Sequence, residues 1–121
     1  MAPVGQRFMK NVKFLRHLRG VRSERERMRL INGAKPDQIF AIMDAANNIL
    51  NGRFPMTKDR RARLIPFGPQ IRKLSKARTD KNARMIMQDG GGSFVPALLA
   101  PVLIHIGSHL VDKLIEKFKK K

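Results

Sequence analysis

Apolar residues recur at helical spacing along most of this chain, and strict alternation of apolar and polar residues is nowhere sustained. Glycine and proline interrupt the apolar segments at short and irregular intervals. Long helices and regular arrays of strands are both inconsistent with this spacing. The pattern predicts an all-α fold, a compact bundle of short helices.

Two helices are predicted before residue 35. The first covers residues 6–19 and ends at Gly20, in the position after a helix where left-handed glycine is common. Its apolar side consists of Phe8, Val12, Leu15 and Leu18. Ser23 and Glu26 have the S-x-x-E spacing of a capping box, which predicts a second, charged helix up to about Ile31.

The most apolar helical segment covers residues 38–50, and we expect Asp37 to cap it. Its narrow polar stripe consists of Asp44, Asn47, Asn48 and Asn51. A helix that is apolar around most of its surface is normally surrounded by other helices. The sequence therefore places this segment at the centre of the core, with Gly52 as its stop.

Three short basic helices are predicted to follow. Thr57 caps the first, which Pro66 ends because proline disfavours helical backbone in the residue before it. Pro69 begins the second, since proline is favoured at the first helical position. Thr79 caps the third, which ends in a run of three glycines.

The composition of the chain changes at the glycine run, from basic before it to apolar after it. We predict a basic body at residues 1–89, a glycine hinge at residues 90–93 and a tail at residues 94–121. Residues 94–111 carry no formal charge, and these 18 residues are at the lower limit for spanning a bilayer. Pro96 and Pro101 interrupt this stretch, and a two-faced helical pattern begins at Val102. The glycines expected to form the hinge are Gly90, Gly91 and Gly92.

The tail has several interpretations that the sequence leaves open. It could span or lie on a membrane, contact a partner or a second copy, or complete the core of the body. The apolar residues expected to make a membrane or partner contact are Phe94, Leu98, Leu99, Leu103, Ile106, Leu110, Leu114 and Phe118.

Positive charge is concentrated in two separate blocks. Residues 1–30 hold nine Lys and Arg against two acidic residues, a net charge of +7, and residues 53–88 hold eleven against two, a net charge of +9. The segment between the two blocks has a net charge of −1. An ordinary solvated surface mixes both signs of charge, so these blocks predict binding to a polyanion such as nucleic acid.

The second basic block supplies the predicted nucleic-acid contacts. They are Arg53, Lys58, Arg60, Arg61, Arg63, Arg72, Lys73, Lys76, Arg78, Lys81 and Arg84. The chain has no Tyr or Trp for stacking on bases and no zinc-finger spacing. We therefore expect contacts to phosphates that are independent of base sequence.

Catalytic, metal and cofactor sites are not predicted. The chain has no Cys and no carboxylate pair beside a base in a recognisable motif, so we expect a protein that is not an enzyme. His105, His109 and Asp112 have a spacing that could hold a metal, but such a trio is usually a solvated polar face. The basic N-terminal residues are not followed by an apolar signal segment, which predicts an intracellular protein.

The tail resembles that of adenovirus core protein X, the precursor of the mu peptide. The residues that carry this resemblance are Gly91, Gly92, Phe94, Val95, Pro96, Leu98, Leu99, Pro101, Ile106 and Gly107. A larger part of the chain, about residues 37–111, resembles the small basic proteins of Polinton (Maverick) elements and adintoviruses. This part also includes the Asn-Ile-Leu-Asn-Gly sequence at residues 48–52, followed by Pro55 and Thr57.

The resemblance implies a virion core or minor structural protein that condenses double-stranded DNA, found in the virion and the host nucleus. Capsid proteins, a membrane surface or a second copy would then be the partners of the tail. Two alternatives from other classes remain: a membrane-active amphipathic protein, and a basic component of a ribonucleoprotein such as an organellar ribosome.

Overall fold

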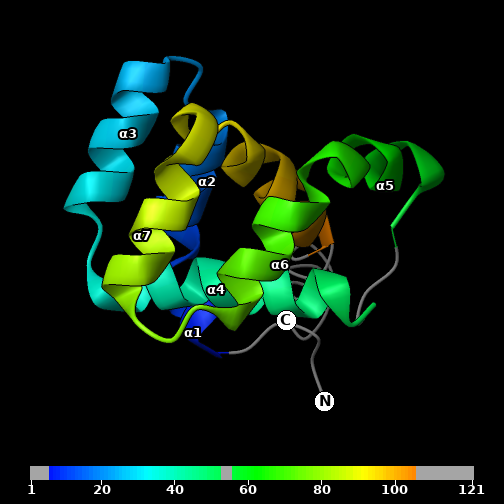
Figure 1. Ribbon diagram of the computed structural model, residues 1–121, viewed down its shortest axis with the longest axis horizontal. Helices are drawn as coiled ribbons and strands as arrows, with labels where there is room; N and C mark the ends of the chain where they lie inside the picture. The colour runs from blue at the N-terminus through cyan, green and yellow to red at the C-terminus, as the bar shows by residue number, and fades with distance from the viewer. Residues whose placement is uncertain (1–5, 53–55, 106–121) are drawn as a thin grey trace, which may run out of the picture.

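The computed structural model describes residues 6–52 and 56–105. These residues form α-helices and short 3-10 turns, with no strand among them, which confirms the all-α prediction (Figure 1). The labelled helices are α1 (Gln6–Lys10), α2 (Val12–Gly20), α3 (Glu24–Gly33), α4 (Pro36–Leu50), α5 (Lys58–Leu64), α6 (Gly68–Lys76) and α7 (Asp80–Gln88). The turns η1 (Ile65–Phe67) and η2 (Asp89–Gly92) follow α5 and α7, and residues 94–105 are helical.

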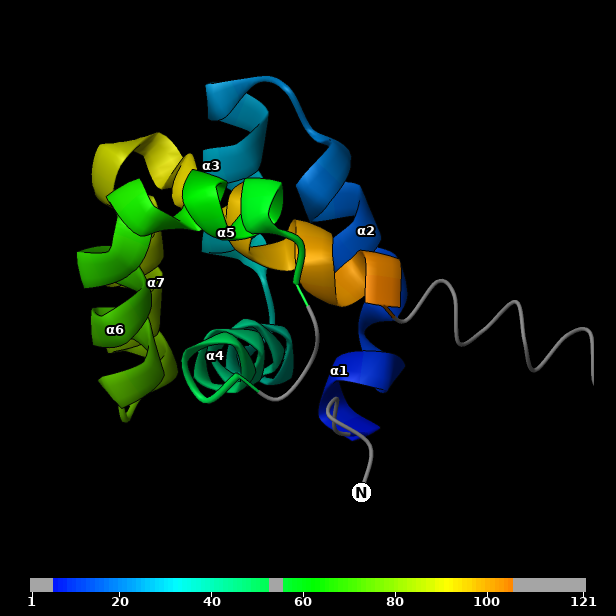
Figure 2. The same ribbon diagram turned by 90° about the vertical axis from the view of Figure 1, so that its right-hand side faces the viewer.

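Helix α4 lies at the centre of the core, as its apolar sequence predicts. It packs against α1, α2, α6 and α7, and Figure 2 looks nearly along its axis, with α6 and α7 on one side and α1 on the other. Ile39, Ala41, Ile42, Ala45 and Ala46 are fully buried. Small residues at three of these positions allow the neighbouring helices to approach closely.

The predicted cap of α4 is wrong. The residue before α4 is Lys35, and its backbone N–H donates a hydrogen bond of 2.8 Å to the side chain of Gln38. Asp37 lies in the first turn and accepts hydrogen bonds from Arg7 and Asn11 instead. Pro36 can begin the helix because the first helical N–H has no partner within a helix.

The first predicted helix is divided at Asn11, where α1 ends and α2 begins. The side-chain amide of Asn11 donates to the carbonyl of Arg7 at 2.8 Å and to Asp37 at 2.9 Å. The backbone N–H of Asn11 turns to the carbonyl of Phe8, three residues earlier, at 3.1 Å. The side chain of Asn11 therefore binds the carbonyl of Arg7, to which the backbone N–H of Asn11 would donate in a continuous helix. The periodicity of the apolar residues does not predict this break.

The other predicted helix boundaries are confirmed except at Gly20 and in the tail. Ser23, Thr57 and Thr79 each accept a hydrogen bond from the backbone N–H three residues later, at the starts of α3, α5 and α7. Gly52 has a φ of +60° after α4, as expected of a left-handed stop. Gly20 instead remains helical, and the chain leaves α2 through Val21 in an extended conformation.

The predicted interruption at Pro96 and Pro101 is wrong, because residues 94–105 are helical through both prolines. Pro96 lies in the first turn of this helix, where a missing backbone N–H is tolerated.

The first part of the tail belongs to the core. Phe94, Leu98, Leu99 and Leu103 are buried in the same hydrophobic cluster as residues of α1 to α7, so these four side chains are not exposed to a membrane or a partner. This is the arrangement in which the tail completes the core. Ile106, Leu110, Leu114 and Phe118 lie outside the described residues. Within the described ranges, no helix is both long and apolar enough to cross a bilayer.

The glycine run, predicted as a hinge, forms the turn η2, which packs against α3. Gly91 and Gly92 have φ angles of +75° and +73°, in the region that favours glycine. The carbonyl of Gly91 accepts a hydrogen bond of 3.0 Å from Nε of Arg27. The described geometry is that of a packed corner between α7 and the helix of residues 94–105.

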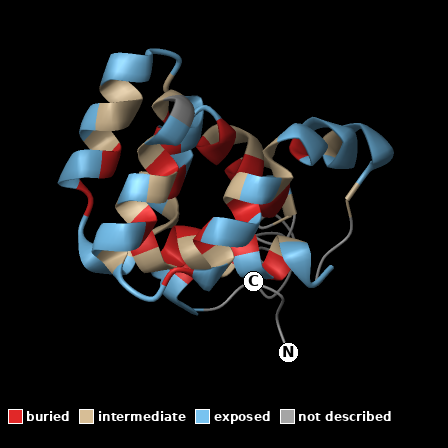
Figure 3. Cartoon of the chain, in the orientation of Figure 1, coloured by how far each residue is buried: buried red, intermediate tan, exposed pale blue. Residues whose placement is uncertain are grey.

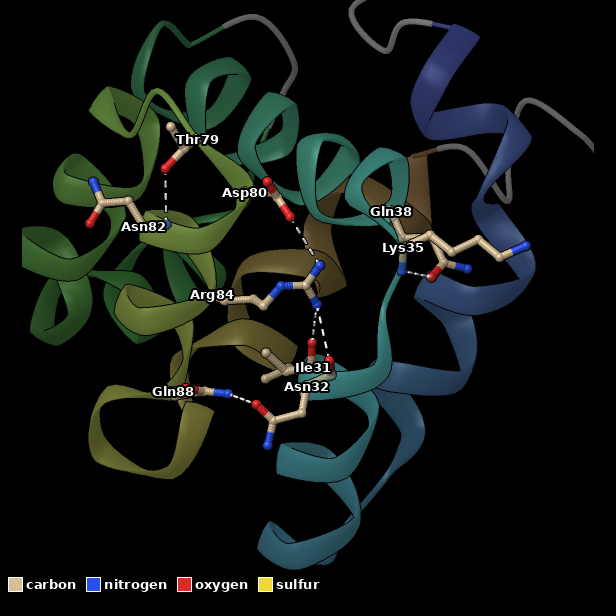
Figure 4. A network of polar contacts seen from close by, with 9 residues as sticks. All are labelled: Ile31, Asn32, Lys35, Gln38, Thr79, Asp80, Asn82, Arg84 and Gln88. Carbon is tan, nitrogen blue, oxygen red and sulfur yellow. Dashed lines mark hydrogen bonds and ion pairs between the residues drawn. The ribbon is translucent and has the colours of Figure 1, made fainter.

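Helices α3 and α7 are joined by a polar network around Arg84 (Figure 4). Its guanidinium donates to the carbonyls of Ile31 and Asn32, at 2.8 and 3.2 Å, and pairs with Asp80 at 3.2 Å. The carbonyls at the end of a helix lack partners within the helix, so Arg84 satisfies them. Gln88 and Asn32 also hydrogen-bond to each other across the two helices.

Substitution of Gly92 tests whether η2 is a packed corner. A Cβ atom at Gly92 would lie 3.0 Å from the backbone carbonyl oxygen of Met87, in addition to the strain of the left-handed φ. We expect Gly92→Ala to lower the free energy of unfolding by about 1–3 kcal/mol in urea denaturation followed by circular dichroism. Gly33→Ala is the matched control, because Gly33 is helical and a Cβ added there would meet nothing within 4 Å. A mobile hinge would instead tolerate both substitutions equally.

Candidate nucleic-acid interface

Four arginines from distant parts of the sequence meet in one surface groove of about 430 Å³, which we call the arginine groove. Arg19 and Arg22 lie at and just after the end of α2, and Arg60 and Arg63 lie on α5. The remaining lining residues are Gly20, Val21, Pro96, Ala97, Ala100 and Pro101. The two basic blocks of the sequence therefore converge here.

The helix of residues 94–105 brings these arginines together. It runs between α2 and α5 in Figures 1 and 2, where it is orange, and its buried side anchors it in the core. Its outer side presents Ala97 and Ala100 to the groove, with Pro96 and Pro101 beside them. None of these side chains is long, so an anion can approach the floor of the groove without steric obstruction.

Among the residues that the structure describes, no carboxylate lines the arginine groove. Arg19, Arg22 and Arg63 are exposed, Arg60 is half-buried, and within the described ranges none of the four forms an ion pair. Like charges gathered without counter-charges repel one another, and a bound anion relieves this repulsion. The groove therefore has the electrostatics of an anion-binding site.

Three arginines outside the groove, Arg7, Arg29 and Arg84, form ion pairs with carboxylates among the described residues. Arg7 lies 3.2 Å from Asp37 and 3.3 Å from Asp44. The pKa of Asp37 is lowered, chiefly by the hydrogen bond from Asn11 and then by Arg7. The pKa of Asp44 is raised because burial outweighs the attraction of Arg7.

The predicted nucleic-acid contacts have different environments in the structure. Arg60 and Arg63 line the arginine groove. Exposed cations elsewhere along α5 to α7 are Lys58, Arg61, Arg72, Lys73, Lys76, Arg78 and Lys81. Figure 3 shows α5 as largely exposed. Arg84 differs from the others because its guanidinium is engaged by α3 and Asp80, with 19% of the side chain exposed. Arg53 lies outside the described residues.

Sequence reasoning did not include Arg19 and Arg22 among the site residues. The net charge of the first block was a signal, but charge alone does not distinguish these two arginines from the seven other Lys and Arg residues of the block. Their role depends on residues 94–105 packing beside both α2 and α5. That helix begins more than 70 residues after Arg22 and more than 30 residues after Arg63, so the packing is a tertiary contact.

A metal site is absent from the described part of the chain, where no cluster of His, Asp or Glu suits an ion. His109 and Asp112, which share a possible metal-binding spacing with His105, lie outside the described residues.

Comparison with protein-family models, curated proteins and solved structures finds no match for this chain.

Proposed function

We propose that this protein binds double-stranded DNA through phosphate contacts that are independent of base sequence. The observation that carries the proposal is the arginine groove, in which four arginines converge and, within the described part of the chain, no carboxylate contributes to the lining. Guanidinium groups suit this role because their planar donors bind phosphate oxygens in pairs.

Duplex DNA matches the wider charge distribution as well as the groove. It carries about one negative charge per 1.7 Å of its axis, so it offers phosphates to several cations at once. Exposed cations on α5, α6 and α7 extend the positive surface beyond the groove. The net charge of +17 also supports condensation, because many bound copies would neutralise the repulsion between neighbouring segments of DNA.

We further propose a role as a virion core or minor structural protein, which would place it in the virion and the host nucleus. The support for this role is the resemblance to the small basic proteins of Polinton elements and adintoviruses, together with the charge of the chain. Phosphate binding requires neither a cofactor nor a catalytic residue, so a role that is not enzymatic fits the proposal.

Titration of the full chain with a fluorescent random-sequence duplex at several salt concentrations tests DNA binding. If about eight phosphates are contacted, the logarithm of the affinity falls with the logarithm of salt at a slope near −7. Competition with duplexes of different sequence should show little preference. Binding that does not respond to salt contradicts the proposal, and tighter binding to structured RNA at equal salt favours the ribonucleoprotein alternative.

A further inference from the structure

Helix α5 borders a second groove, which differs in character from the arginine groove. This apolar groove has a volume of about 830 Å³ and lies between the end of α4, α5, η1 and α6. Its apolar lining consists of Ile49, Leu50, Met56, Leu64, Ile65 and Ile71. Arg61 and Arg72 are the charged residues of the lining within the described ranges, which contribute no carboxylate to it.

The apolar groove is open to solvent. Leu64 and Ile71 are buried and form its base, whereas Ile65 is 70% exposed and Leu50 is 43% exposed. Exposed large apolar side chains around a hollow are typical of surfaces that contact another protein. Small-molecule sites usually enclose most of the ligand, which an open groove does not do. An amphipathic helix needs contact along one side and therefore fits this shape better.

The charged residues of the apolar groove indicate which kind of partner it would bind. The guanidinium of Arg72 lies beside Gly68, where an added Cβ atom would be 3.3 Å from Nη1. The lack of a side chain at Gly68 thus leaves room for this arginine at the edge of the groove. Together with Arg61, it places two positive charges beside an apolar surface. An occupant with carboxylates next to its apolar residues is complementary to both features.

We propose that the apolar groove binds an amphipathic helix of a partner protein, with Leu, Ile or Phe on one side and Asp or Glu flanking them. A second copy of this chain is a poorer occupant, because its net charge of +17 would repel the same charge on the first. This inference does not depend on DNA binding. If both hold, α5 connects a DNA-binding face with a partner-binding face.

Fluorescence anisotropy with synthetic peptides tests this proposal on the full chain. The probe is a labelled helical peptide of about four turns, with Leu on one side and Glu beside it. A second peptide has Lys in place of Glu, and a third has the acidic composition in scrambled order. We expect the acidic amphipathic peptide to bind at least about tenfold tighter than the scrambled one, because only its Leu residues can enter the groove together.

Charge reversal provides the decisive comparison. The double substitution Arg61→Glu with Arg72→Glu should lower the affinity for the acidic peptide at least about tenfold. It should also confer binding of the Lys peptide. Lys73→Glu with Lys76→Glu makes the same change in net charge on exposed positions outside the groove and should have less than about a threefold effect. Ile65→Ser, at an exposed position, should also weaken binding at least about tenfold.

Three results would overturn the proposal. The scrambled peptide could bind as tightly as the amphipathic one, or the two charge reversals could lower the affinity equally. Either result would show that the binding is general charge attraction. Sedimentation equilibrium could instead show self-association that Ile65→Ser abolishes, which would make a second copy the occupant.

Discussion

Replacing Arg19, Arg22, Arg60 and Arg63 together with alanine should lower the affinity for duplex DNA about a hundredfold at 0.15 M salt. Each phosphate contact that is lost removes about 0.9 from the slope of log affinity against log salt, so the slope should become shallower by about 3 to 4. The physical reason is that these four guanidinium groups converge, and no carboxylate of the described residues neutralises them. The measurement is the salt titration with a random duplex described above.

A matched variant separates the groove from total charge. Lys73, Lys76, Arg78 and Lys81 are exposed and lie outside the arginine groove, and their replacement with alanine removes the same four charges. We expect this variant to lose less than about tenfold in affinity. Equal losses in the two variants would contradict a localised site and indicate diffuse attraction. Circular dichroism of both variants verifies that the fold is retained.

Replacing the same four arginines with lysine tests the geometry of the contact. Lysine keeps the charge but lacks the planar, paired donors of the guanidinium group. The salt slope should then stay close to that of the native chain, since it counts neutralised phosphates. A decrease in affinity at an unchanged slope would show that paired hydrogen bonds add to the charge attraction.

Local signals in the sequence were sufficient to predict most helix boundaries. Thr57, Pro69 and Thr79 act on the backbone within one helical turn, so the starts of α5, α6 and α7 followed directly from them. The central position of α4 followed from its apolar surface. Each of these features depends on neighbours in the sequence.

The features that sequence reasoning missed depend on distant residues. Asn11 divides α1 from α2 while its side chain also binds Asp37, and this bond requires α4 to lie alongside. Arg84 resembles the other cations of its block in sequence, yet it binds carbonyls at the end of α3. Charge patterns identify which residues are cationic, but only the packing determines which cations remain available to an external anion.

The position of the tail gives the arginine groove its floor. Ala97 and Ala100 can line the groove only because Phe94, Leu98 and Leu99, on the same helix, are buried in the core. The stability of the fold and the shape of the site are therefore coupled through residues 94–105. A substitution that loosens this helix should weaken DNA binding as well as the fold.

Leu99→Ala measures that coupling, and we expect it to lower the free energy of unfolding by about 2–5 kcal/mol. Leu99 is fully buried, and truncation of a buried leucine removes its apolar contacts and leaves a cavity. The chain has no Trp or Tyr, so far-UV circular dichroism in urea is the suitable measurement. The same variant should bind duplex DNA more weakly under conditions in which part of the population is unfolded.

Two controls give the Leu99→Ala result its meaning. Ile104, on the same helix, is 41% exposed, so Ile104→Ala should cost clearly less. Leu74→Ala, in α6, should cost about as much as Leu99→Ala, because both residues are fully buried in one hydrophobic cluster. If Leu74→Ala destabilises the body while Leu99→Ala leaves its unfolding unchanged, residues 94–105 form a separate unit. The arginine groove would then not be fixed in shape, since the helix of residues 94–105 lies between the arginines of α2 and those of α5.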